Sequence, residues 1–200
     1  MKIRPIQEGE LNRLGRFRYE IYVEEMQRIQ LYADHDHRVI IDPLDEGATN
    51  FIAEQNGSIV GTVRVNFPRD TSVGDYESFY AIPDDSYMRE ATSITTRLMV
   101  SPRLRGGSLP LRLALTAYEF GLRNGILFDH IDCNDHLRSF FFKLGYEEMF
   151  RKNHAEYGDV TCLVLRLRDR KRLSNSGSPF LKALDAFDQS KTFNQIEEYA

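Results

Sequence analysis

The stretch Arg97-Leu98-Met99-Val100-Ser101-Pro102-Arg103-Leu104-Arg105-Gly106-Gly107-Ser108 decides the fold of this chain. The β-branched run that leads into it, residues 93–100, predicts a strand, and the apolar spacing after it predicts a helix over 109–124. A glycine-containing loop between a strand and a helix leaves backbone N–H groups and the positive end of the helix dipole directed at one point. Such a point is suited to a phosphate group, although an ordinary tight turn with solvated arginines has the same composition.

Outward from this stretch, periodicity predicts one α/β domain in which strands and helices alternate. The expected strands are 2–6, 51–55, 58–67, 93–100, 126–133 and 161–168, and the expected helices are 11–26, 109–124 and 134–144. Asn56-Gly57 suits the tight turn of a hairpin. Asn134 is expected to cap the last of these helices, and Gly145 is expected to end it.

A second segment, residues 134–146, has the spacing Asn-Asp-His-Leu-Arg-Ser-Phe-Phe-Phe-Lys-Leu-Gly-Tyr. Together with Arg-Leu-Arg-Gly-Gly-Ser at 103–108, it resembles the GNAT family of N-acetyltransferases. The positions that match the two family motifs are Arg103, Gly106, Ser108, Asn134, Lys143, Gly145 and Tyr146. The resemblance implies a GNAT fold, a mixed central β-sheet flanked by helices with a V-shaped split between the two central strands. It departs at Phe141, where the family has a tyrosine that can protonate the leaving thiolate.

The N-terminal half narrows the resemblance to one branch. It contains, in order, Arg18-x-x-Ile21-Tyr22, Asp42-x-x-Asp45, Gly61-Thr62-Val63-Arg64 and then Arg97-Leu98. This order is similar to the branch that holds acyl-homoserine-lactone synthases, which make autoinducers, and long-chain N-acyl amino acid synthases, over residues 10–168. The chain lacks the tryptophan that the lactone synthases place after the Tyr22 position, and it has Ile94 where they have glutamate. Those departures favour the N-acyl amino acid synthases.

The resemblance implies a set of site residues. The expected catalytic residues are Asp42, Asp45 and Arg97, and the expected substrate-binding residues are Arg18, Tyr22 and Arg64. The expected acyl-donor contacts are Leu98, Met99, Val100, Arg103, Arg105, Gly106, Gly107, Ser108, Asn134 and Lys143.

These residues also have structural interpretations. Asp42 and Asp45 flank a proline and could cap a turn, and an arginine on an apolar strand is rarely buried without a carboxylate partner. Structural ion pairs and recognition of a substrate carboxylate are both consistent with the pattern. His35 and His37 lie two residues apart in an acidic loop, a pattern that favours a solvated loop over a metal site. No metal is expected.

Composition excludes several classes of function. The 200 residues have a formal net charge of −4, so no basic field is present to hold nucleic acid. No stretch approaches the roughly 20 apolar residues that span a bilayer, and the expected location is the cytoplasm. Cys133 and Cys162 give no metal spacing and are interpreted as buried structural residues.

The chain is divided into an acyltransferase domain, residues 1–169, and a linker with a C-terminal helical tail, residues 170–200. The small polar run at 174–178 is interpreted as a flexible linker. Phe180, Leu181, Leu184 and Phe187 would line one face of a short helix that docks onto the domain or onto a second subunit.

The expected activity is N-acyl transfer, in which a long-chain acyl group moves from an acyl-carrier-protein or CoA thioester to the amine of an amino acid. The donor is a co-substrate, and no permanently bound cofactor is expected. Arg103, Arg105 and Lys143 would suit an acidic carrier protein. Two alternatives stay open: an acetyl-CoA-dependent N-acetyltransferase of a small amine or protein, and a non-catalytic acyl-thioester binding module.

Overall fold

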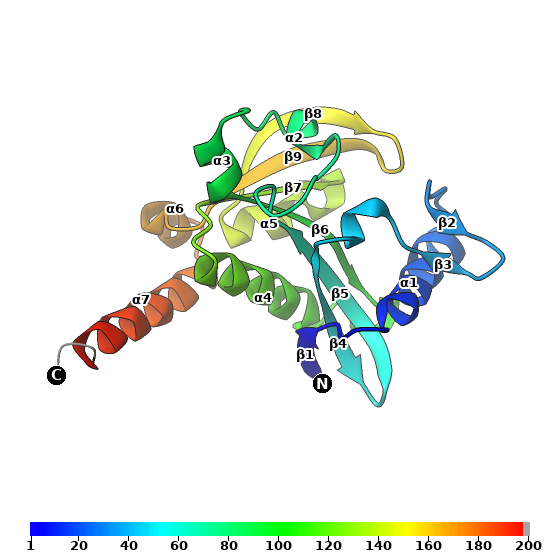
Figure 1. Cartoon of the computed structure of the whole chain (residues 1–200), viewed down its shortest axis with the longest axis horizontal. Coiled ribbons are helices and arrows are strands. Elements are labelled where there is room, and N and C mark those ends of the chain that lie inside the picture. Colours follow the sequence, from blue (N-terminus) through cyan, green and yellow to red (C-terminus); the bar gives the residue numbers. More distant parts are fainter. Residues whose placement is uncertain (198–200) are drawn as a thin grey trace.

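The computed structural model of the chain describes residues 1–197, with side chains described through residue 190. Its centre is a seven-stranded sheet in the order β1-β4-β5-β6-β7-β9-β8, flanked by helices (Figure 1). The strands are β1 (Lys2–Pro5), β4 (Thr49–Gln55), β5 (Ser58–Asn66), β6 (Thr92–Val100), β7 (Phe128–Cys133), β8 (Glu147–His154) and β9 (Gly158–Arg166). Two short strands, β2 (Ala33–Asp34) and β3 (Val39–Ile40), pair apart from this sheet. The predicted mixed α/β fold is confirmed.

The sheet opens between β6 and β7, its one parallel pair within the described residues. These strands are paired only from Thr92 opposite Phe128 to Ile94 opposite His130, although β6 continues to Val100 and β7 to Cys133. Beyond the last pair the two strands diverge, which leaves the facing edge of each without a neighbouring strand. This is the predicted V-shaped split.

A β-bulge lies on the free part of β6, where the register with β5 shifts between Thr62 and Arg64. Arg97 occupies the bulge with a φ of 55°, a left-handed conformation that is uncommon for a residue other than glycine. Because a bulge inserts one extra residue, the alternation of side chains is interrupted, and Thr96 and Arg97 both contact groups on the same face of the sheet.

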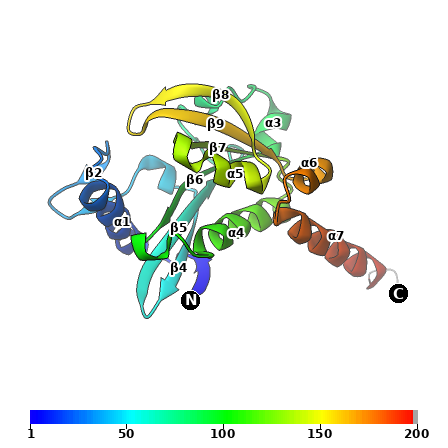
Figure 2. The same ribbon diagram turned by 180° about the vertical axis from the view of Figure 1, so that it is seen from behind.

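Helices cover the two faces differently. On one face, α4 (Leu109–Arg123) and α5 (Arg138–Leu144) pack with Val63 and Ile131 in the largest apolar cluster. On the other face, α1 (Leu11–Tyr19) packs on Ile52 and Met99. Figure 1 shows α1 and α4 on opposite sides of β5, and Figure 2 shows α5 next to α4 from behind. Two short helices, α2 (Tyr76–Phe79) and α3 (Ser86–Ala91), precede β6.

Several predicted elements differ in detail. The helix predicted over 11–26 is α1 continued by a π-helical turn, Glu20–Glu25. The prediction that Asn134 caps a helix is wrong: its side chain makes no capping bond, and a 3-10 turn, Asp135–Leu137, precedes α5. Gly145 ends α5 in the left-handed conformation, as predicted. The final strand begins earlier than predicted, at Gly158, because it forms a hairpin with β8, which was not predicted.

The C-terminal segment is more regular than a linker. Residues 170–175 form α6 (Arg170–Asn175), and the hydroxyl of Ser178 donates to the carbonyl of Leu144 at 2.7 Å, so residues 174–178 end a helix and form a tight turn. In the next helix, α7 (Phe180–Glu197), Phe180 stacks on Tyr118 of α4 at 4.2 Å. The predicted docking of this helix onto the domain is therefore observed. The division of the chain at residue 169 stays a prediction, and its last residues, 198–200, lie outside the described part.

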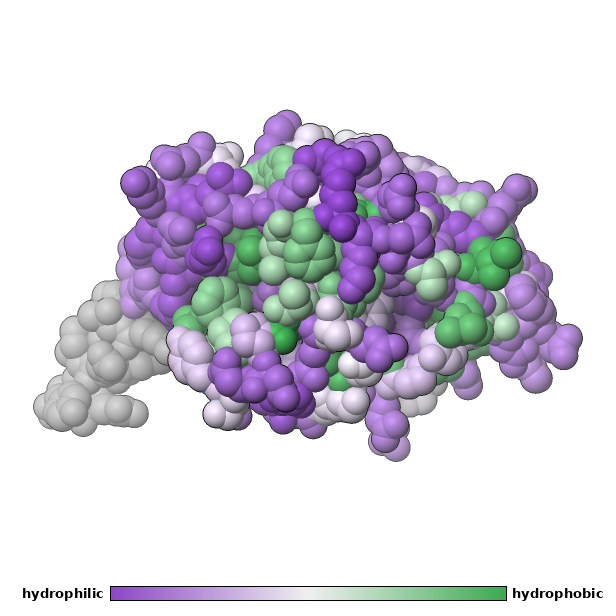
Figure 3. Space-filling model, turned by 90° about the horizontal axis from the view of Figure 1, so that it is seen from above, coloured by the Kyte–Doolittle hydropathy of each residue, from purple (hydrophilic) through white to green (hydrophobic). Residues whose placement is uncertain are grey.

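The side of the molecule at the top of Figure 1 carries both hydrophobic and hydrophilic residues. Seen from above, hydrophobic atoms gather in the middle of the molecule and hydrophilic atoms border them (Figure 3). Among the described residues, none of the helices combines the length and apolar character that a bilayer-spanning segment needs.

Candidate active site in the opened sheet

A cavity of about 500 Å³ lies where β6 and β7 separate. Its lining includes both free strand segments, from Thr95 to Val100 on β6 and from Ile131 to Cys133 on β7. One wall is apolar and consists of Leu111, Ala114 and Ala117 of α4 with Phe140 and Phe141 of α5. The opposite wall holds polar groups, namely Tyr22, Tyr76, Thr96, Arg97, Asp132 and Tyr157. The cavity thus joins an apolar region to a polar one through the gap in the sheet.

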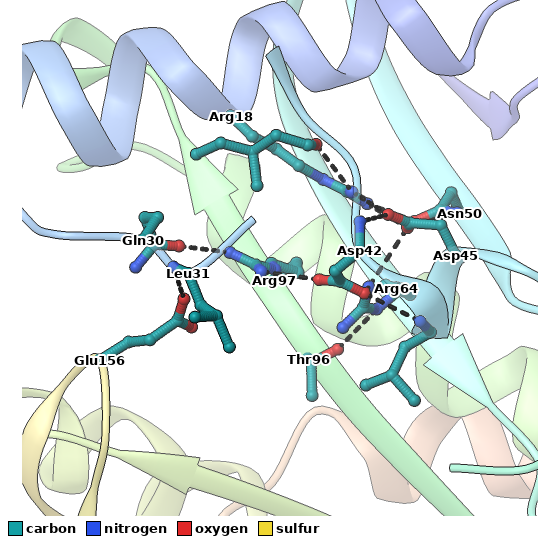
Figure 4. Close-up of polar contacts among 12 residues, drawn as sticks. Arg18, Gln30, Leu31, Asp42, Asp45, Asn50, Arg64, Thr96, Arg97 and Glu156 are labelled. Carbon is teal, nitrogen blue, oxygen red and sulfur yellow. Dashed lines mark hydrogen bonds and ion pairs between the residues drawn. The ribbon is translucent and has the colours of Figure 1, made fainter. Parts of the chain in front are cut away.

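Five of the predicted residues form one buried ion cluster beside the polar wall (Figure 4). Arg18 donates to both carboxylate oxygens of Asp45 at 2.7 and 2.9 Å. Arg64 contacts Asp42 at 2.5 Å and Asp45 at 3.2 Å. Arg97 contacts Asp42 at 2.7 Å. The structure brings these five residues together, and the aspartate that pairs with Arg97 is Asp42.

Local sequence explains the geometry of the two aspartates. Asp42-Pro43-Leu44-Asp45 forms a 3-10 turn in which the Asp42 carboxylate accepts from the amide of Leu44, and Asp45 accepts from the amide of Asp42. This reciprocal capping fixes both carboxylates on one side of the turn. The structural interpretation, a capped turn, and the ion cluster are therefore both present.

The electrostatics of the cluster make the aspartates weak proton acceptors. Burial alone would raise the pKa of Asp42, but Arg64 and Arg97 outweigh it and hold that pKa below its usual value. Burial opposes ionisation of Asp45 in the same way, and the hydrogen bonds and charge of Arg18 hold its pKa far lower still. Both carboxylates are ionised at neutral pH, and the cluster of three guanidinium groups has one positive charge in excess.

Arg97 is the member of the cluster that reaches the cavity. It also donates to the side chain of Gln30 at 2.8 Å and to the hydroxyl of Tyr157 at 3.2 Å, and its guanidinium lies 5.1 Å from the centre of the Tyr22 ring. These partners hold the guanidinium plane in one orientation. Such a planar, fixed guanidinium is suited to binding a carboxylate.

The predicted acyl-donor residues divide into two groups. Those that line the cavity are Leu98, Met99, Val100, Arg105, Gly107 and Asn134. Those that do not line it are Arg103, Gly106 and Ser108, which are exposed at the start of α4, and Lys143, which is exposed on α5. Ser108 makes no side-chain cap, so the first amides of α4 are left without that acceptor.

Two of the predicted acyl-donor residues, Arg105 and Asn134, form hydrogen bonds within the chain. Arg105 donates to Glu25 at 2.5 and 2.6 Å and to the carbonyl of Val100 at 3.0 Å. Asn134 donates to the carbonyl of Tyr157 at 3.0 Å and accepts from Arg28 at 3.1 Å. Asn134 therefore connects the turn between β8 and β9 to the segment after α1, at the rim of the cavity.

Sequence reasoning missed the polar residues of β7. Asp129 is buried and accepts hydrogen bonds from three hydroxyl groups, and Asp132 lines the cavity. The available signal was their placement: Asp129, His130 and Asp132 interrupt an otherwise apolar predicted strand just before Asn134. Buried polar residues in a central strand need partners, so such an interruption is itself informative.

The histidines and cysteines lie where a structural interpretation puts them. His37 is exposed and contacts Asp34, and Nδ1 of His35 lies 2.8 Å from the hydroxyl of Tyr19. Among the described residues, no group of three potential ligands is placed to hold a metal ion. Cys133 and Cys162 are buried and unpaired, and burial raises the pKa of Cys133 to about 12.

Comparison with solved structures agrees with the fold. BjaI, described as a CoA-dependent acyl-homoserine lactone synthase with SAM and isopentyl-CoA, is 20% identical over 88% of this chain and 90% of its own, with a TM-score of 0.68. FeeM, described as an N-acyl amino acid synthase from uncultured soil microbes, is 15% identical over 84% and 97%, with a TM-score of 0.65. YncA from Salmonella typhimurium, described as a putative acetyltransferase with acetyl-CoA, has a TM-score of 0.57, with 15% identity over 84% and 95%.

Comparison of the sequence identifies the family. No curated protein matches the chain. The family model described as N-acyl amino acid synthase FeeM matches residues 13–172, a range that includes the ion cluster, both free strand segments and the loop before α4. The chain therefore belongs to the FeeM family of N-acyl amino acid synthases, and it is an acyltransferase whose acceptor is an amine.

Proposed function

We propose that this acyltransferase moves a long-chain acyl group from an acyl-carrier-protein or CoA thioester to the α-amine of an amino acid. The observation that supports it is the cavity in the opened sheet, apolar along α4 and α5 and faced by Arg97 on the other side. An N-acyl amino acid has the same division, because one amide joins a hydrocarbon chain to a carboxylate. The reacting carbonyl would lie where the two regions meet.

The donor arm would enter along the free edge of β6. Beyond Ile94 this edge has no β7 partner, so its backbone groups can bind the pantetheine amides and the thioester oxygen. The phosphate of the carrier or of CoA would lie at the loop 103–108, near the first amides of α4. Arg103 and Lys143 are exposed there and would attract an acidic carrier.

The acceptor would be held by its carboxylate at Arg97. Asp42 and Asp45 then act as positioning residues, since they fix Arg97 and Arg64 while leaving one positive charge uncompensated. Arg18 anchors Asp45 from the far side, and Tyr22 covers Arg97. A buried guanidinium with a fixed plane binds a carboxylate at lower entropic cost than a mobile surface arginine does.

The chemistry is direct aminolysis. The neutral amine attacks the thioester carbon, a C–N bond forms, the C–S bond breaks, and the nitrogen loses one proton. A thiol has a pKa of about 8.5, so the thiolate can depart without the tyrosine that Phe141 replaces. Holding amine and carbonyl at the gap in the sheet supplies much of the acceleration.

The experiment incubates the purified protein with long-chain acyl-CoA or acyl carrier protein and a panel of amino acids, and follows thiol release together with product mass. Thiol release that requires an amino acid, with formation of the N-acyl amino acid, is expected. Release without an amide product, or transfer only to non-carboxylate amines, would overturn the proposal. The Arg97→Ala variant is the control for adventitious aminolysis.

A further inference from the structure

Strand β7 presents two aspartates to opposite faces of the sheet. Asp129 and Asp132 are three residues apart, and side chains alternate along a strand. Asp129 accepts hydrogen bonds from Ser93 at 2.6 Å, from Thr95 at 2.7 Å and from Tyr146 at 2.5 Å. It is buried, and both of its carboxylate oxygens accept hydrogen bonds. Asp129 therefore closes the apex of the opening and has no capacity for substrate.

Asp132 has the opposite character. It lies two residues past His130, the last residue of β7 that pairs with β6. It therefore belongs to the free segment of β7, residues 131–133, called here the β7 arm, and it lines the cavity; the free segment of β6, residues 95–100, is the β6 arm. The hydroxyl of Tyr80 donates to Oδ1 at 2.6 Å. Among the described residues, Oδ2 has no side-chain hydrogen bond. One oxygen is thus oriented by the protein, and the other is available in a partly open site.

The register places Asp132 opposite the arginine wall. Thr96 lies two residues past Ile94 on β6, as Asp132 lies two past His130 on β7, and the last residues to pair are Ile94 and His130. The two side chains therefore point to the same face across the gap. The bulge adds Arg97 to that face. A carboxylate held at Arg97 would bring the α-amine into the space between the two arms.

We propose that Asp132 is the general base that accepts the proton of the attacking amine, and that Tyr80 positions it. This inference rests on the proposed function. The neutral amine attacks as Oδ2 takes its proton, the C–S bond breaks, and the thiolate and Asp132 then exchange protons with solvent. Asp42 and Asp45 cannot serve, because guanidinium groups occupy their oxygens and depress their pKa.

Protonation of Asp132 is set by several neighbours. Burial raises its pKa above the usual value, while the hydrogen bond from Tyr80 and the charges of His154 and Arg97 oppose that rise. Tyr76 and Cys162 also face it. A base works only when ionised, so a raised pKa means that activity falls as the pH drops through that pKa.

The test compares Asp132→Asn with the wild type on two acceptors that both have a carboxylate, an α-amino acid and aminooxyacetate. The aminooxy nitrogen is weakly basic, so once it has attacked the thioester its N–H is acidic enough to lose the proton to water without a protein base. With the amino acid, kcat/KM should fall about a hundredfold or more while the donor KM changes little. With aminooxyacetate, Asp132→Asn should lose less than about tenfold in kcat/KM. The pH profile of Asp132→Asn with this acceptor should lack an acid limb.

Controls separate this inference from the proposed function. Asp129→Asn makes the same change on the same strand and should keep both the acid limb and most of the activity. Tyr80→Phe should alter kcat more than the acceptor KM. Full activity of Asp132→Asn on amino acids, in an enzyme whose wild type makes the amide, would overturn the role of Asp132 alone. A wild type that acylates no amino acid would overturn both proposals.

Discussion

The two arms of the opened sheet are built for different tasks. The β6 arm presents a guanidinium, Arg97, anchored by Asp42 of a capped turn. The β7 arm presents carboxylates, with Asp129 saturated by hydroxyl groups and Asp132 open to the cavity. Ion pairs lower the pKa of the two aspartates in the turn beside β6, whereas burial raises the pKa of the two aspartates on β7. The same residue type therefore serves as an anchor on one arm and as a proton acceptor on the other.

Removing the guanidinium from the β6 arm should have a large effect on use of the acceptor. Arg97→Ala is expected to lower kcat/KM for the amino acid about a hundredfold. Loss of a buried guanidinium that pairs with the substrate carboxylate costs about 3 kcal/mol of binding free energy. The donor KM should change little. Steady-state kinetics with both substrates varied would check this, and the melting temperature would report any loss of folding.

A double-mutant cycle sharpens the same point. Arg97→Ala and Asp42→Ala should be much less than additive, since the two side chains are in direct contact. Arg97→Lys keeps the charge but not the planar fork, so it should recover only part of the activity. Additive losses would mean that the two residues act separately.

The apolar wall predicts a preference for long acyl chains. A chain of more than about ten carbons should be transferred at least about tenfold more efficiently than acetyl, because each buried methylene contributes about 0.8 kcal/mol. The measurement is kcat/KM for acetyl, octanoyl and dodecanoyl thioesters on one carrier. A preference for acetyl would show that the residues along α4 and α5 form only a core.

The loop before α4 predicts a donor-specific effect. A Cβ placed on Gly106 meets no protein atom within 4 Å, so the fold has room for a side chain to begin there. Gly106→Val should raise the donor KM about tenfold by blocking the approach of a phosphate to the backbone. The acceptor KM and the melting temperature are the internal controls. An unchanged donor KM would place the phosphate elsewhere.

The saturated aspartate of β7 should affect stability more than turnover. Burial raises the pKa of Asp129 to about 6, so between its unfolded and folded pKa values the folded protein binds more protons than the unfolded chain. Wild-type stability should therefore decrease as the pH rises through that window. Asp129→Asn cannot ionise and should lose this dependence, worth up to about 3 kcal/mol. Denaturant unfolding at about pH 4 and about pH 7 would detect it, and parallel curves for the two proteins would contradict it.

The sequence indicated the charged residues at the β6 arm but not the polar residues of the β7 arm. A buried arginine or aspartate needs a partner of opposite charge. The sequence could therefore indicate that Arg64, Arg97 and Asp42 lie close together. The role of Asp132 depends on where β6 and β7 part, which is a property of pairing and not of composition. The bulge at Arg97 is likewise invisible in the sequence, because arginine rarely adopts a positive φ.

The reason that the sequence does not predict β8 is simpler. β8 is an edge strand with charged, mostly exposed side chains, so it lacks the alternation that identifies a half-buried strand. Asn134 was assigned to a helix cap from local pattern alone, and its bonds to β9 and Arg28 are long-range contacts. Local periodicity does not predict such contacts.

The most direct test of the acceptor site at Arg97 compares an amino acid with its own amide as acceptor. Both have the same amine and side chain, but only the acid has the carboxylate that Arg97 would bind. We predict that kcat/KM for the acid, expressed per neutral amine at the assay pH, exceeds that for the amide about a hundredfold, and that Arg97→Ala abolishes the difference. Equal rates for acid and amide in the wild type would contradict it.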